Sequence, residues 1–150
     1  MHNEFIHSEI LKPVVVLIAW SIVMLIWAVA TRLPALRAAG IDITKLTGGK
    51  GSDADGVLPP KTQWKAHNYN HLMEQPTCFY AVALVIALTG TGDGMNAWIA
   101  WAYVALRIVH SIWQATVNKV SIRFMLFALA TLCLAALTVH AAMAVFHAHG

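Results

Sequence analysis

The chain has 150 residues, of which 59% are hydrophobic and only 11% are charged. A soluble domain carries about 25% charged residues, because charges cover its surface. The composition therefore excludes a disordered chain, a nucleic-acid-binding arm and an ordinary water-soluble fold. It predicts an all-α integral membrane protein that is surrounded by membrane lipids and has no nucleic-acid partner. The net charge of +3 comes from basic residues beside apolar runs, which is typical of membrane proteins.

Four stretches of the chain are long and apolar enough for a membrane-spanning helix, which takes about 20 residues. The first helix is predicted at about 10–33, with no charge between Lys12 and Arg32. A polar loop rich in Gly and Pro follows at about 34–64. Three further helices are predicted at about 66–89, 95–118 and 121–146. We interpret residues 1–150 as a single four-helix membrane domain.

The basic residues predict how the chain crosses the membrane. Eight of the ten Lys and Arg residues lie in the first loop and its flanks or near the connection between the third and fourth helices. The side of a multi-pass protein that is richer in these residues faces the cytoplasm. The prediction is therefore a multi-pass topology with both termini outside the cytoplasm.

Polar side chains follow one face of the third predicted helix. At spacings of four, three, four and four residues, this face carries Tyr103, Arg107, His110, Gln114 and Asn118. Lipid offers no hydrogen bonds, so this polar stripe must face a protein neighbour or a wet cavity.

The second predicted helix has a matching polar cluster near its cytoplasmic end, made of His67, Asn70, His71 and Glu74. The short turn at 90–94 makes the second and third helices antiparallel neighbours, and counting from it places Glu74 and Arg107 within roughly 5 Å in depth. We therefore expect an ion pair between these two residues. The pair could lock the helices together or belong to a ligand site, and both interpretations stay open.

The spacing of His67, His71 and Glu74 also permits a metal site, although we predict none.

Two sequence blocks resemble the signatures of the MAPEG family, the membrane-associated proteins of eicosanoid and glutathione metabolism. The first block has Asn70 before Glu74, followed by Pro76 and aromatic residues; the second has Arg107 and His110, with another arginine, Arg123, sixteen residues after Arg107. The resemblance covers about 64–130 by motif and the whole chain by topology. It implies a four-transmembrane-helix bundle that forms a homotrimer, with glutathione bound between neighbouring subunits near the cytoplasmic side.

The resemblance also implies roles for individual residues. Glu74 and Arg107 would shape the glutathione site, with His110 beside them, and Arg123 would stabilise the glutathione thiolate as the catalytic residue. The remaining glutathione-binding candidates are Asn70, His71 and Gln114. Because a thiolate is a strong nucleophile, the implied activity is that of a glutathione-dependent transferase or peroxidase acting on lipophilic electrophiles or lipid hydroperoxides. The pattern looks bacterial, which implies the inner membrane as the location.

The chain departs from the family pattern at the same site. The enzymes usually have Asn three residues before the Glu, where this chain has His71, and often Tyr at the position of Gln114. These changes remove contacts to a tripeptide that carries two carboxylates. The alternative prediction is a non-catalytic lipid-binding protein or an accessory or structural subunit of a larger membrane complex.

Overall fold

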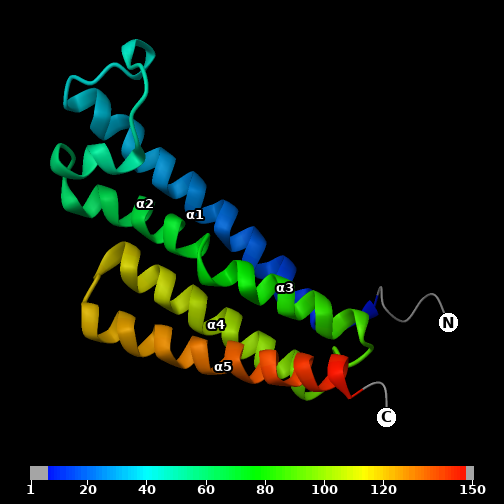
Figure 1. Ribbon diagram of the computed structural model, residues 1–150. Helices are drawn as coiled ribbons and strands as arrows, with labels where there is room; N and C mark the ends of the chain where they lie inside the picture. The colour runs from blue at the N-terminus through cyan, green and yellow to red at the C-terminus, as the bar shows by residue number, and fades with distance from the viewer. Residues whose placement is uncertain (1–6, 148–150) are drawn as a thin grey trace.

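A computed structural model describes residues 7–147, and within them all regular structure is helical. The helices, including two short 3-10 helices labelled η, are α1 (Leu11–Ala38), η2 (Ile43–Lys45), η3 (Gly51–Gly56), α2 (Pro60–Leu72), α3 (Gln75–Leu88), α4 (Met95–Thr116) and α5 (Val120–Phe146). α2 and α3 run back along α1, and α4 and α5 lie beside them as an antiparallel pair (Figure 1). The start of α1 and the end of α5 lie at the same end of the molecule (Figure 1). The termini whose location we predicted, residues 1–6 and 148–150, lie outside the described residues.

Three helical segments are long and apolar enough to cross a membrane, namely Leu11–Ala38, Pro60–Leu88 and Val120–Phe146. This finding supports the prediction of an integral membrane protein. α4 is the fourth long helix; its 22 residues are sufficient for a span of about 33 Å, but a polar stripe interrupts its apolar sequence and it is not among the three.

The second predicted helix is divided where a continuous helix was expected. α2 ends at Leu72 and α3 begins at Gln75, with Glu74 between them at φ −89° and ψ −100°. Pro76 explains the break, because its ring lacks an N–H and would clash with the carbonyl of Leu72 in an unbroken helix. The break turns the Glu74 side chain outward, which matters for the site.

The first predicted helix is longer than expected, since α1 continues past Pro34 to Ala38. It ends in a Schellman motif, in which the Ile41 N–H donates to the Leu36 carbonyl and the Gly40 N–H donates to the Arg37 carbonyl, both at 3.0 Å. Gly40 has φ +74°, a left-handed conformation that glycine adopts without strain. The motif directs the chain back along the side of α1.

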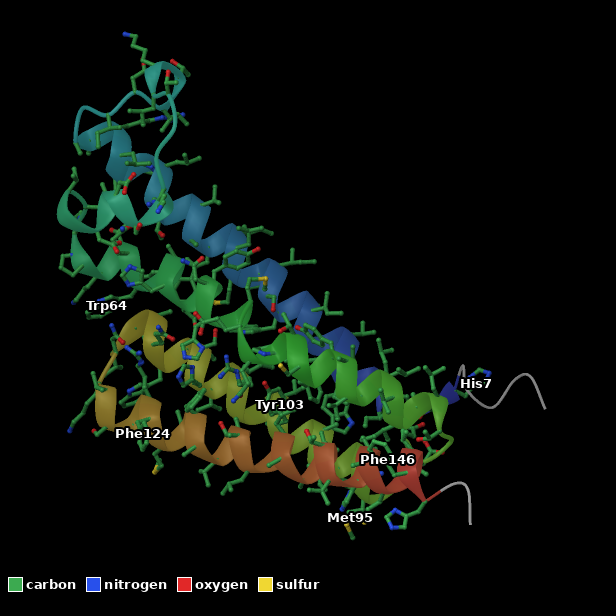
Figure 2. All side chains as sticks on the ribbon, viewed as in Figure 1. His7, Trp64, Met95, Tyr103, Phe124 and Phe146 are labelled. Atoms are coloured by element: carbon green, nitrogen blue, oxygen red, sulfur yellow. The ribbon has the colours of Figure 1, made fainter. Side chains whose placement is uncertain are left out.

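The apolar core fills the space between the helices. The rings of Phe79 and Tyr103 stack with centroids 4.4 Å apart, and both side chains are fully buried. Figure 2 labels Tyr103 near the middle of the molecule, between the helices. The core therefore fixes the position of α4, which carries the polar stripe.

The turn before α4 packs tightly against the start of the chain. The Ile10 N–H donates to the Gly92 carbonyl at 3.0 Å, and a Cβ at Gly92 would lie 1.9 Å from Ser8 Oγ and 2.8 Å from Ile10 Cγ2. Gly92→Ala is therefore expected to destabilise the protein by about 1–3 kcal/mol, because a methyl group would be forced into a filled space. Thermal unfolding in detergent measures this effect. Gly56→Ala is the control, since a Cβ there meets nothing within 4 Å; equal melting temperatures of the two variants would refute the prediction.

The loop after α1 is fastened to α2 through one carboxylate. Asp55 Oδ1 lies 2.9 Å from His67 Nε2, and the same oxygen accepts a hydrogen bond from Gln63 Nε2. The hydrogen bond with His67 is the main cause that holds the pKa of Asp55 below its ordinary value of 3.8, with smaller contributions from Gln63 and the charge of Arg32. The loop thus depends on an ionised Asp55.

Because the pKa of Asp55 is lowered on folding, its contribution to loop docking should be present above pH 3.8 and lost as pH falls through the lower, folded value. We expect amide exchange in η3, corrected for its intrinsic pH dependence, to increase below about pH 4. Asp55→Ala should exchange faster at neutral pH and lose this acid transition. Ser52→Ala is the matched control in the same loop, and an acid transition that persists in Asp55→Ala would assign it to another group.

Candidate functional site

The centre of the candidate site is a buried arginine on α4. Arg107 is only 1% exposed, and its Nη2 atom donates to His71 Nδ1 and to the His71 carbonyl, both at 3.1 Å. Since an arginine can only donate, His71 accepts through Nδ1 and a neutral ring carries its proton on Nε2. Arg107 Nε and Nη1 have no hydrogen-bond partner among residues 7–147. A buried cation with two unused donor atoms is a strong site for an anion.

The predicted ion pair between Glu74 and Arg107 is not formed within the chain. The Glu74 side chain is 70% exposed, and its nearest charged or titratable contact is His71 Nδ1, at 3.9 Å. The physical reason is the helix break at Glu74, which replaces the expected inward orientation by an outward one. His71 therefore occupies the position beside Arg107 that we expected for Glu74.

Beside His71 lies a small cavity that contains the predicted catalytic residue. Its volume is about 180 Å³, and it is lined by His71, His110, Val120, Arg123, Phe124 and Phe127. The ring centroids of His71 and His110 are 5.1 Å apart, and His110 is 2% exposed. The structure thus brings three predicted residues, His71, His110 and Arg123, around one cavity next to Arg107.

Arg123 is held in place at the start of α5. Its Nη1 atom donates to Asn118 Oδ1 at 2.6 Å, whereas its Nε has no partner among the described residues. Asn118 lies in the turn between α4 and α5 at φ +57°, a left-handed conformation that Asn tolerates better than most residues. The turn therefore positions a guanidinium at the cavity without neutralising its charge.

The other predicted residues lie apart from the cavity. Gln114 is 4% exposed on the buried face of α4, and its Oε1 atom lacks a partner among residues 7–147. Asn70 is exposed on the outer face of α2, one turn before Glu74. Four polar residues on the two sides of the helix break are exposed, and we call them the exposed polar stripe: His67, Asn70, Glu74 and Thr77.

Four polar residues that the sequence interpretation missed connect the helices beside the site. The Tyr103 hydroxyl donates to Gln75 Oε1 at 3.2 Å, and Gln75 Nε2 donates to Thr131 Oγ1 at 2.8 Å, which links α4, α3 and α5. Nearby, the fully buried Asn68 donates to Ser111 Oγ. Gln75 could have been found from the sequence, because an uncharged amide inside an apolar span needs a protein partner. Nitrogen and oxygen atoms gather between α2 and α4 in Figure 2.

The residues considered for a metal site do not converge. His67 contacts Asp55 and His71 accepts from Arg107, so the two imidazoles serve different partners. Within the described part of the chain, no group of three His, Cys, Asp or Glu side chains could hold a metal ion.

Comparison with known proteins gives one result that covers nearly the whole chain. The model of the MAPEG family matches residues 10–143. No match was found among curated proteins or among solved structures.

Proposed function

Because this chain belongs to the MAPEG family, we propose that it binds glutathione and joins it through its sulfur to lipophilic electrophiles, or uses it to reduce lipid hydroperoxides. In this proposal the four long helical segments, α1, α2 with α3, α4 and α5, form a four-span bundle in the bacterial inner membrane. The start of α1 and the end of α5 face away from the cytoplasm, in keeping with the basic loop between α1 and α2.

The observation that carries the proposal is that the guanidinium of Arg107 is buried and has donor atoms without partners among the described residues. An unpaired charge in a protein interior costs several kcal/mol, so a guanidinium that is 1% exposed and has two unused donor atoms requires an acceptor. Carboxylate oxygens of glutathione would accept from these atoms in short, charge-assisted hydrogen bonds, with a separate acceptor for Nε and for Nη1, because the two atoms lie on different edges of the guanidinium.

A homotrimer would complete this site. The exposed polar stripe on α2 and α3 lies within a segment that is apolar enough to span the membrane, where lipid cannot accept or donate hydrogen bonds. A neighbouring subunit that covers the stripe would bring Glu74 and Asn70 into a shared interface. It would also enlarge the cavity of about 180 Å³, which is below the usual range for small-molecule sites of about 300–1,000 Å³.

Arg123 would act on the sulfur of glutathione. A guanidinium is always charged, and a nearby cation lowers the pKa of a thiol. The thiolate sulfur would then form a bond to the electrophilic atom of the substrate, and that atom's bond to its leaving group would break. Phe124 and Phe127 would offer an apolar surface to a substrate that arrives from the bilayer.

One observation favours a second candidate function, a non-catalytic lipid-binding or accessory membrane subunit. His71 already accepts one hydrogen bond from Arg107 through its ring and one through its carbonyl. In this case Arg107 would act as a structural link between α2 and α4, and no tripeptide would be needed.

Titration of glutathione into the detergent-purified protein separates the two candidates. Saturable binding accompanied by the ultraviolet absorbance of a thiolate supports the glutathione enzyme. An absence of binding, together with co-purifying lipid or partner proteins, supports the accessory subunit. The oligomeric state, measured in the same preparation by light scattering corrected for detergent, tests the trimer.

A further inference from the structure

A second cavity lies at the far end of α1, away from the glutathione site proposed above. Its volume is about 400 Å³, and it is lined by Leu33, Leu36, Arg37, Gly40, Ile41, Asp42, Ile43 and Thr44. The cavity exists because the Schellman motif at Gly40 turns the chain back against the last two turns of α1. Figure 1 shows this segment where α1 passes into the cyan loop at one end of the molecule.

The depth of this cavity corresponds to the headgroup layer of the membrane. The uncharged stretch of α1 ends at Arg32, and Arg37 lies five residues further along the helix, which is roughly 8 Å. The polar layer on each side of the hydrocarbon core is about 5–8 Å thick. Arg37 therefore reaches the level of lipid phosphates.

Two charged side chains line the cavity, Arg37 and Asp42, and Arg37 is the one without an ion-pair partner among the described residues. Asp42 accepts hydrogen bonds from the Thr44 N–H at 3.0 Å and from Thr44 Oγ1 at 2.7 Å, and it lies 3.5 Å from Lys45 Nζ. These hydrogen bonds hold the pKa of Asp42 below its ordinary value, so it stays ionised and engaged within its own turn. The Arg37 side chain is exposed and makes no hydrogen bond or ion pair with any residue in 7–147.

The apolar part of the same cavity fits the upper part of a lipid. Leu33, Leu36 and Ile41 form its wall. Ile43 beside them is 51% exposed, and Leu46, three residues further along the loop, is 61% exposed. Exposed apolar side chains of this kind beside an unpaired basic side chain are typical of segments that contact the membrane surface.

We propose that this cavity binds an anionic phospholipid of the cytoplasmic leaflet. Arg37 binds the phosphate, and Leu33, Leu36, Ile41 and Ile43 contact the glycerol and the first methylene groups of the acyl chains. The site is separate from glutathione binding, and it anchors the loop that connects α1 with α2 to the membrane surface.

Native mass spectrometry of the full chain in detergent tests the proposal, with phosphatidylglycerol and phosphatidylcholine of identical acyl chains as probes. We expect phosphatidylglycerol to bind about fivefold more tightly, since one basic residue near the surface contributes about 1 kcal/mol. Arg37→Gln should abolish this preference, and Ile43→Ser should weaken the binding of both lipids.

The matched control is Lys61→Gln, which removes an exposed cation from the same end of the molecule outside the cavity. It should keep the fivefold preference. Equal binding of the two lipids by the unaltered chain, or an equal loss in both charge variants, would overturn the proposal. Displacement of phosphatidylglycerol by inorganic phosphate would also overturn it, because the site would then bind a free anion.

Discussion

Arg123→Ala is expected to abolish the thiolate absorbance of bound glutathione and to lower turnover by about 100- to 1000-fold, while the protein keeps its fold and oligomeric state. Arg123 lines the cavity beside His71 and His110, and its Nε has no partner among the described residues. Removing it takes the permanent positive charge away from the sulfur, so the thiol would titrate near its ordinary pKa of about 8.5 and little thiolate would form at neutral pH. Stopped-flow absorbance measures the thiolate, and product formation measures turnover.

Two further variants separate the charge of Arg123 from a general effect on the start of α5. Arg123→Lys keeps a cation but loses the planar donor group, so it should retain part of the thiolate signal. Lys119→Ala removes an exposed cation four residues earlier, outside the cavity, and should behave like the unaltered chain. Full activity of Arg123→Ala in an intact oligomer would remove Arg123 from the mechanism.

The pattern of polar residues on α4 could be predicted from the sequence because helical periodicity is a local property. Spacings of three and four place Tyr103, Arg107, His110 and Gln114 on one face, and the structure buries all four. The same stripe explains why α4 differs from the three apolar segments: its polar side chains lower its hydropathy while its length stays sufficient for a span.

The partner of Arg107 could not be predicted in the same way. Depth counted along two helices assumes that both are continuous, and Pro76 breaks the second one. The break moves the carboxylate of Glu74 outward and leaves His71, three residues earlier, beside the guanidinium. Which residue faces a neighbour after a break depends on the backbone angles of Met73 and Glu74, and these are set by packing against the other helices.

A similar argument applies to the end of α1. The apolar run predicts an end at about residue 33, whereas α1 continues past Pro34 to Ala38. The helix continues because Gly40, and not the proline, supplies the conformation that terminates it. The extra turn is what creates the cavity that we assign to a lipid.

Arg107→Leu is expected to weaken glutathione binding by at least about 100-fold, because two hydrogen bonds to a charged group contribute about 3–6 kcal/mol together. The melting temperature without glutathione should change little. Replacing a buried, partly unpaired charge by an apolar side chain of similar volume is often neutral or stabilising, although His71 Nδ1 would lose its donor. Isothermal titration calorimetry and thermal unfolding of the same preparation measure both quantities.

The two candidate functions predict opposite results for this variant, which makes it more decisive than a loss of activity alone. If Arg107 only connects α2 with α4, Arg107→Leu should lower the melting temperature, and glutathione should not bind to the unaltered chain either.

Tyr103→Phe is the control on the same face of α4: it removes the hydroxyl that donates to Gln75 but no charge. It should cost about 1 kcal/mol in stability and leave the dissociation constant of glutathione unchanged. A loss of affinity in Tyr103→Phe as large as that in Arg107→Leu would mean that helix packing, and not the guanidinium, controls binding.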